Sequence, residues 1–220
     1  MSMQKNDFVR ISYSGKIKDM EQKLDSGENI PVIVGIGYVM KGVDNALLEM
    51  NVGEKKIVEI NPGDAFGERD QKLVRLLKES EFKKHNTNPY PGLTVDADGT
   101  RGRVLSVASG RVKVDFNHPL AGKVLVYDLE IKEKIESVHE KIKAIIEYYA
   151  KSQSERIESH IHEKTVEIIM PPIINTLYKK KVADDIMQFL GFEKVKFSEV
   201  FEKPKEDTQT GTASDSATNT

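Results

Sequence analysis

The chain of 220 residues contains no cysteine. Without cysteine it cannot form a disulfide scaffold, perform thiol catalysis or hold zinc through thiolates. It also lacks any apolar run near the ~18 residues that indicate a membrane-spanning helix. The segment Met1–Asp7 is polar and has no apolar core of the kind found in secretory signals. We therefore expect a cytoplasmic protein with no membrane partner.

The chain also has no large excess of either charge, because it contains 33 basic and 35 acidic residues. This balance gives no sign of a nucleic-acid partner, and we expect none.

The usual catalytic patterns are also absent. No Ser-His-Asp arrangement or pair of carboxylates stands out, and there is no P-loop lysine. Gly35-Ile36-Gly37 is followed by the next glycine only at Gly42, which is not dinucleotide-binding spacing. Such a chain either binds a partner or catalyses a reaction that needs no acid, base or nucleophile. Prolyl isomerisation is one, because its barrier of ~18–20 kcal/mol comes from amide resonance. It requires an apolar pocket with one or two hydrogen-bond donors.

Two segments could suggest a metal. Asp96-Ala97-Asp98-Gly99 begins like a calcium loop but lacks the glycine at position six and the glutamate at position twelve. His160 and His162 could share a strand face, but structural sites usually take four ligands. We expect neither a metal nor a cofactor.

Apolar spacing predicts an α+β protein. Alternation predicts strands at 8–13, 30–34, 54–60 and 124–131, and apolar residues three and four apart predict a helix over 43–50. The polar segment 15–29 reads as turn-rich. Between these elements, residues 71–119 form a separate unit, with a short helix at 79–84 and strands at 93–95, 101–108 and 112–116.

The pattern changes again after Lys132. We expect an α-β-β-α-β module over 135–203, with helices at 135–149 and 177–190, a hairpin formed by 156–161 and 165–170, and a last strand at 195–201. Residues 204–220 are rich in Ser, Thr, Gly and Asp, and we expect them to be disordered.

Five motifs, in this order, give a family resemblance: Ile11-Ser12-Tyr13-Ser14-Gly15, Gly37-Tyr38-Val39-Met40-Lys41-Gly42-Val43, Pro62-Gly63-Asp64-Ala65-Phe66-Gly67, Asn117-His118-Pro119-Leu120-Ala121-Gly122 and Leu125-Val126-Tyr127-Asp128-Leu129-Glu130. The chain resembles the SlyD-like branch of FKBP-type peptidyl-prolyl cis-trans isomerases, in the long form found in archaea.

This resemblance implies an FKBP-like antiparallel sheet wrapped on a short helix, formed by 1–70 plus 120–134. The unit 71–119 would be a mostly-β domain inserted in the flap. The C-terminal α/β module, 135–203, has no counterpart in the isomerase chemistry, and relatives of this long type suggest that it forms a homodimer.

The resemblance also implies a pocket. Tyr13 would line its wall, and Tyr127 would close it. Asp25 would be the pocket aspartate that polarises the twisted amide, although its distance from Tyr13 along the chain is longer than usual and leaves Asp19 as an alternative. Ile30 stands in place of a bulkier aromatic residue and suggests a more open site.

The remaining pocket positions follow the same motifs. Val39 and Met40 would form the edge, and the Met40 backbone N–H would hold a substrate carbonyl. Val43 would form the floor. Phe66 stands where a tyrosine often contacts a substrate carbonyl, so we expect less dependence on that hydrogen bond, which is worth ~0.5–1.5 kcal/mol net.

In the insert, apolar side chains lie close together in the sequence. They could hold an unfolded chain if exposed, or form the insert's own core if buried. These residues are Leu73, Val74, Leu76, Leu77 and Phe82.

The resemblance implies a peptidyl-prolyl isomerase and folding chaperone that acts on unfolded or nascent polypeptides containing X-Pro bonds. One alternative is a holdase or interaction protein with weak or no isomerase activity. Another is a transcription-associated factor, because the fold also occurs there.

Overall fold

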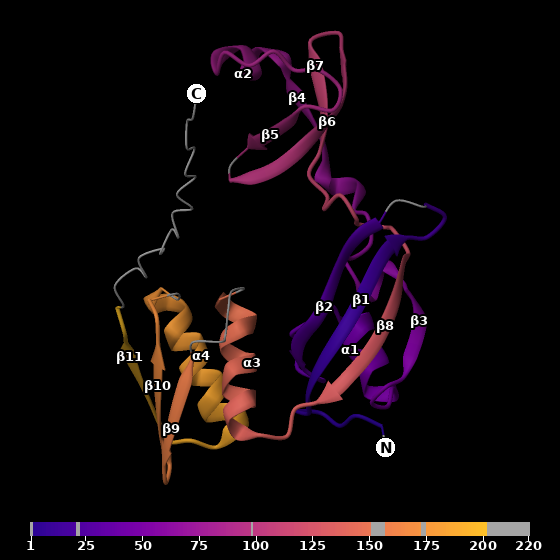
Figure 1. Cartoon of the computed structure of the whole chain (residues 1–220). Coiled ribbons are helices and arrows are strands. Elements are labelled where there is room, and N and C mark those ends of the chain that lie inside the picture. Colours follow the sequence, from indigo (N-terminus) through magenta and orange to yellow (C-terminus); the bar gives the residue numbers. More distant parts are fainter. Residues whose placement is uncertain (1, 21–22, 98, 151–156, 173–174, 202–220) are drawn as a thin grey trace, which may run out of the picture. The chain divides into compact units, whose positions relative to one another are not determined.

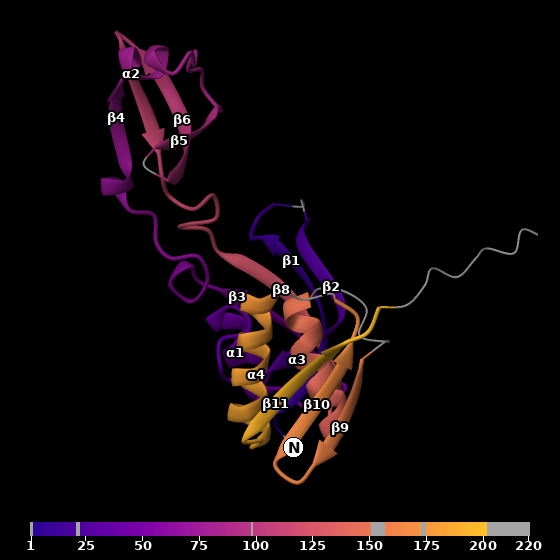
Figure 2. The ribbon, with the colours of Figure 1, turned by 90° about the vertical axis from the view of Figure 1, so that its left-hand side faces the viewer.

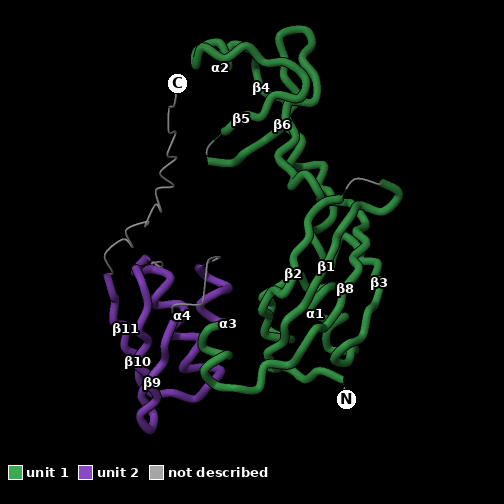
Figure 3. Tube along the Cα trace, viewed as in Figure 1, with its two compact units in different colours: residues 1–144 green, residues 145–220 purple. Residues whose placement is uncertain are grey.

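The computed structural model describes residues 2–20, 23–97, 99–150, 157–172 and 175–201. It divides into two compact units, residues 1–144 and 145–220, shown in Figure 3. The tail expected to be disordered lies outside the described residues, as does Arg156 of the expected hairpin. No helix of the described part is long and apolar enough to cross a membrane.

The first sheet is antiparallel and packs against one short helix, which confirms the predicted fold class (Figure 1). Its strand order is β2-β1-β8-β3. The elements are β1 (Phe8–Ile17), β2 (Lys23–Ile33), α1 (Lys41–Glu49), β3 (Lys55–Ile60) and β8 (Leu125–Lys134).

The expectation of a turn-rich segment over 15–29 is wrong, because β1 continues to Ile17 and β2 already begins at Lys23. The reason is the position of β2 at the edge of the sheet. Its first half is solvated on much of its surface, so its sequence shows no apolar alternation.

One core holds this sheet and helix together. It combines inward residues of β1 and β8 with the apolar face of α1, whose Val43, Ala46 and Leu47 are buried as the helical spacing predicted. The packing is tight at Gly42, because a Cβ at this position would lie 2.3 Å from Cγ2 of Ile60.

A second sheet is formed within residues 74–115, with the order β4-β7-β6-β5 (Figures 1 and 2). The elements of this region are β4 (Val74–Lys78), α2 (Glu79–Lys84), β5 (Thr94–Ala97), β6 (Thr100–Ala108) and β7 (Arg111–Asp115). It has its own core of Val104, Val112, Val114 and Phe116. Two 3-10 turns, η1 (Pro62–Asp64) and η2 (Gln71–Leu73), lie in the chain between β3 and β4.

The segment that leaves the first sheet and the segment that returns to it are held together by hydrogen bonds and an ion pair. Asn117 accepts a hydrogen bond from the Asp70 N–H (2.8 Å) and donates one to the Asp70 carbonyl (2.9 Å). Arg69 pairs with Asp115 at 2.5 Å. Burial by itself raises the pKa of the Asp115 carboxyl, but hydrogen bonds from Asn117 and the charge of Arg69 outweigh it and hold this pKa below its usual value. The predicted boundaries at 70/71 and 119/120 stay predictions.

The C-terminal part follows the predicted order of elements: α3 (Val138–Ala150), β9 (Glu158–His162), β10 (Thr165–Met170), α4 (Thr176–Leu190) and β11 (Lys194–Glu199). β10 pairs with β9 antiparallel and with β11 parallel, so α4 is the crossover between two parallel strands. Asn175 caps the start of α4 by accepting the Tyr178 N–H, and Gly191 ends the helix in the left-handed conformation (φ 75°).

Candidate active site

Three neighbouring strands of the first sheet bring an acid, a glycine and a tyrosine side by side. In the antiparallel register Gly15 of β1 is opposite Asp25 of β2 on one side and Tyr127 of β8 on the other. Directly opposite residues point to the same face of a sheet. The side chains of Asp25 and Tyr127 therefore meet over the glycine.

The hydroxyl of Tyr127 donates a hydrogen bond to Oδ1 of Asp25 at 2.9 Å. A Cβ on Gly15 would lie 2.5 Å from the Tyr127 ring and 2.6 Å from the same Oδ1, so only glycine leaves room for this contact. Burial of Tyr127, then its hydrogen bond to Asp25 and the negative charge of that residue, raise the pKa of Tyr127 far above its usual value. The tyrosine therefore stays protonated and keeps donating.

Tyr13 extends this cluster. Its ring centroid lies 6.1 Å from that of Tyr127, with the planes tilted by 45°. Burial and the Asp25 charge raise the pKa of Tyr13 as well. Gly27 is opposite Tyr13, and a Cβ there would meet both Tyr13 and Ile30 at 2.7 Å. Two glycines thus make room for the cluster's large side chains.

Asp25, not Asp19, takes the place beside Tyr127. Asp19 lies in the turn after β1 with a left-handed backbone (φ 63°). That Asp25 is the pocket aspartate with a catalytic role stays a prediction.

The loop before α1 is held by a buried carboxylate. Oδ1 of Asp44 accepts the Gly35 N–H at 2.7 Å, and Oδ2 accepts the Gly37 N–H at 2.9 Å. Both glycines have left-handed φ angles, of 79° and 83°. Asp44 is the one charged residue among the buried polar side chains of the described chain. It therefore fixes the loop that leads directly into Val39 and Met40.

We expect Asp44→Asn to destabilise the protein by about 2 kcal/mol, because an amide nitrogen would face one of the two backbone N–H groups and a charge-assisted hydrogen bond would be lost. Urea unfolding should show this loss, and the Gly35 and Gly37 amides should exchange with deuterium faster. Asn45→Ala, at the exposed next position of α1, should change stability by no more than about 0.5 kcal/mol. Equal effects of the two substitutions would contradict this role for Asp44.

The residues predicted for the pocket edge and floor lie around the same core as Tyr127. Val43 is buried in it, and Val39, Met40, Tyr13 and Ile30 are half-buried and pack against it. Met40 is also the N-cap residue of α1. Among the described residues, none accepts a hydrogen bond from its backbone N–H. This N–H is therefore a donor available to a ligand.

Phe66, whose part in the pocket stays a prediction, contacts a histidine. Its exposed ring stacks on His118, with centroids 4.4 Å apart and planes within 2°. Nδ1 of His118 accepts the Leu120 N–H at 3.2 Å. Lys41 pairs with Asp64 at 2.6 Å and links the Phe66 loop to the start of α1. Among the described residues the ring that stacks on Phe66 is this histidine, which belongs to the Asn117–Gly122 motif.

The apolar residues predicted for the insert divide into two groups. Leu73, Leu77 and Phe82 pack against the insert's core. Leu76 is 63% exposed, and Val74 is half-buried. The set therefore contains both core-packing and exposed side chains.

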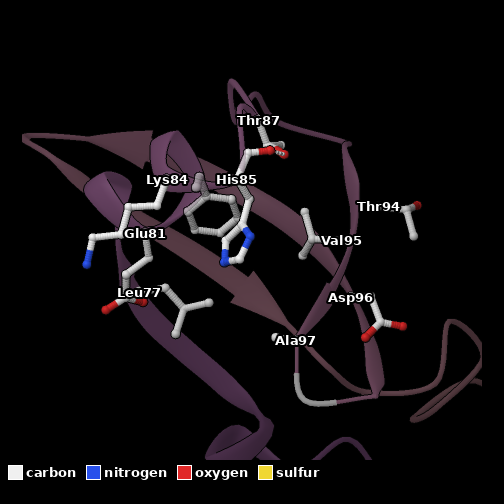
Figure 4. Close-up of a pocket in the computed structure, with 10 residues that line it drawn as sticks. Leu77, Glu81, Lys84, His85, Thr87, Thr94, Val95, Asp96 and Ala97 are labelled. Carbon is white, nitrogen blue, oxygen red and sulfur yellow. Dashed lines mark hydrogen bonds between the residues drawn. The ribbon is translucent and has the colours of Figure 1, made fainter.

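A groove of about 730 Å³ lies between α2 and β5. Leu77, Phe82, Val95 and Ala97 give it an apolar floor, with Glu81, Lys84, His85 and Asp96 among its polar lining residues. Figure 4 shows Leu77, His85 and Val95 around the same hollow. The groove therefore combines apolar and charged lining residues.

Among the described residues no group of three or more potential ligands could hold a metal ion. His160 lies 3.9 Å from Glu158 of the same strand, which makes a pair and not a site.

Comparison with known proteins assigns the family. The family model described as FKBP-type peptidyl-prolyl cis-trans isomerase matches residues 1–86. Those described as the IF domain and the C-terminal part of FKBP26 match residues 75–120 and 138–202. The short-type peptidyl-prolyl cis-trans isomerase of Methanocaldococcus jannaschii is 30% identical over 146 residues, which are 60% of this chain and 93% of that protein.

The chain belongs to the FKBP-type peptidyl-prolyl cis-trans isomerases. The FKBP-type isomerase SlyD of Pasteurella multocida is 29% identical over 148 residues, 64% of this chain and 74% of its own. A probable FKBP-type 16 kDa isomerase of Pseudomonas fluorescens is 38% identical over 103 residues, 44% of this chain and 67% of its own. The resemblance drawn from the motifs is thereby confirmed.

Sequence reasoning missed several residues of this candidate site. Gly15 and Gly27 give no pattern signal, because a glycine in a strand shows its use only when its neighbours are known. Asp44 reads as an ordinary acid in the first turn of a helix. His118 was seen only as part of a motif.

Proposed function

We propose that this protein catalyses the cis-trans isomerisation of X-Pro bonds in unfolded or partly folded polypeptides, and that its insert holds those polypeptides near the catalytic cluster. The observation that carries the proposal is the tyrosine cluster closed by the hydrogen bond between Tyr127 and Asp25, with the Met40 N–H available beside the same core. The family membership supports the chemistry.

The mechanism needs no proton transfer. A planar amide is stabilised by charge-separated resonance, which is lost as the C–N bond twists. An apolar surface of aromatic rings solvates the planar, more polar form less well than water does, and so favours the twisted form. The Met40 N–H would fix a substrate carbonyl, while Tyr13, Tyr127 and Val43 would form the wall and floor against the prolyl ring.

In this scheme Asp25 is a positioning residue, since it acts through Tyr127. We expect Asp25→Ala to lower kcat/KM about tenfold, equivalent to about 1.4 kcal/mol. Asp25→Asn should keep activity within about threefold, because an amide oxygen can still accept the Tyr127 hydroxyl. It should also move the pKa of Tyr127 down toward its usual value, because the nearby negative charge is gone. A chymotrypsin-coupled tetrapeptide assay and an ultraviolet titration of tyrosine measure these effects. Wild-type turnover in Asp25→Ala would refute the assignment of the cluster.

The direct test of the proposal is proline-limited refolding of an unfolded test protein. Uncatalysed X-Pro isomerisation takes tens to hundreds of seconds, so the slow phase is easily followed. We expect acceleration at substoichiometric amounts of the protein. A slow phase that is unchanged, or retarded only near equimolar amounts, would favour the alternative of a holdase.

The chaperone role rests on the groove between α2 and β5 and on its apolar lining residues. Exposed apolar area of this kind suits the transient capture of unfolded chains. The cytoplasmic location and dimerisation through residues 135–203 stay predictions of the sequence.

A further inference from the structure

The near balance of charge over the whole chain conceals an uneven distribution. Residues 71–119 carry nine Lys and Arg against five Asp and Glu, whereas the rest of the chain carries 24 against 30. The insert is therefore a basic body in an otherwise acidic protein.

The register of the insert sheet shows where part of this charge lies. Lys78 of β4 is directly opposite Arg111 of β7, and Lys113 of β7 is directly opposite Leu76 of β4. The buried residues Val112 and Val114 alternate with these positions and point into the core. Lys78, Arg111, Lys113 and Leu76 thus share the outward face, and we name them the basic face.

The same side of the sheet continues with Arg103 and Arg101 of β6, which alternate with the buried Gly102 and Val104. These two arginines and Leu105, which is 39% exposed, line a hollow of about 950 Å³. We therefore include Arg101, Arg103 and Leu105 in the basic face, which interleaves five cations with two exposed leucines.

Lys78, Arg111 and Lys113 have no acid directly opposite them, whereas Arg103 is opposite Asp115 and Arg101 is opposite Asp96. Among the described residues none of the five takes part in an ion pair, and the nearby acids have other partners: Asp115 binds Arg69 and Asn117, and Glu79 pairs with Lys83. Asp96, opposite Arg101, accepts the Gly99 N–H. Like charges directly opposite each other, as in Lys78 and Arg111, destabilise a sheet. The stability of the sheet therefore does not explain this row of cations without ion pairs.

We propose that the basic face is a second polypeptide-binding surface, which selects acidic segments that also carry apolar residues. The cations attract carboxylates, and the leucines bury apolar side chains that alternate with them. The aromatic rings that line the hollow are Phe116, which is buried, and His118, which already stacks on Phe66, and this favours a polypeptide over single-stranded nucleic acid. The inference rests on the proposed function in so far as the bound polypeptide is a folding client.

The test uses the full chain and a fluorescent, proline-free peptide rich in glutamate and leucine, with partner peptides in which each glutamate is replaced by glutamine or by lysine. We expect anisotropy titrations to give at least tenfold tighter binding of the acidic peptide than of the other two. Raising the salt from about 0.05 to 0.5 M should remove most of this preference, because exposed charges are screened.

The variant R111E/K113E should bind the acidic peptide about tenfold more weakly and the neutral peptide unchanged. It should fold, since Glu at position 111 would be opposite Lys78 and form a favourable cross-strand pair. The control K180E/K194E makes the same change of net charge on exposed lysines of the C-terminal module and should leave binding within twofold.

Equal binding of acidic and neutral peptides, or an unchanged R111E/K113E, would overturn the inference. So would a 12-nucleotide single-stranded RNA that binds more tightly than the acidic peptide and is lost in R111E/K113E, because the face would then be a nucleic-acid site. Tetrapeptide isomerisation, measured on the same samples, separates the two proposals. If acidic selectivity persists without turnover, the proposed function fails and the basic face stands.

Discussion

We expect Gly15→Ala to lower kcat/KM for a tetrapeptide about a hundredfold, equivalent to about 2.7 kcal/mol of transition-state stabilisation. The added Cβ would lie 2.5 Å from Cε1 and Cζ of Tyr127 and 2.6 Å from Oδ1 of Asp25, which is closer than non-bonded atoms approach. Tyr127 is buried at 2% exposure and cannot swing aside without disturbing the core. The added methyl group would therefore displace the Tyr127 ring and also break the hydrogen bond from Tyr127 to Asp25.

The matched control is Gly63→Ala. A Cβ at Gly63 would meet nothing within 4 Å, and its backbone is not left-handed. We expect this variant to keep turnover within about twofold. Circular dichroism and urea unfolding of both variants would separate a local effect on the site from loss of the fold. If Gly15→Ala folds and turns over like Gly63→Ala, the Asp25–Tyr127 contact has no part in catalysis.

This prediction shows where sequence reasoning reaches its limit. The helix over 43–50 could be predicted because Val43, Ala46, Leu47 and Met50 recur on one face, and all four are buried. Tyr13 and Tyr127 could be placed in one site because their motifs follow a known order. The role of Gly15 could not be predicted, since it depends on Asp25 and Tyr127 meeting above the glycine from two other strands.

Edge strands were the other source of error. β2 and β4 each lie at the edge of their sheet. The sequence of the first half of β2 predicts turns, and the Val-Arg-Leu-Leu-Lys run of β4 shows apolar residues but no strand pattern. An edge strand has neighbours on one side, so solvent reaches more of its side chains, and the alternation that reveals a strand fades. In β4 this leaves Leu76 exposed while Leu77 packs inward.

Deleting the insert should separate catalysis on short and long substrates. We expect a chain in which residues 71–116 are replaced by a short glycine-containing linker to keep tetrapeptide turnover within about threefold. Its catalysis of proline-limited protein refolding should fall by about a hundredfold, because a tethered binding surface raises the local concentration of captured X-Pro bonds. The linker is feasible since Asp70 and Asn117 exchange two hydrogen bonds and hold the ends together.

A milder pair of variants guards against damage from the deletion itself. Val95→Asp places a charge in the apolar groove, whereas Thr100→Asp places one at an exposed position of the neighbouring strand β6, outside that lining. We expect Val95→Asp to slow protein refolding severalfold and Thr100→Asp to leave it unchanged, with tetrapeptide turnover equal in both. If the deletion lowers tetrapeptide turnover as much as refolding, the insert supports the shape of the catalytic site. If it lowers neither, polypeptides reach Tyr13 and Tyr127 without being held, and the chaperone part of the proposal is wrong.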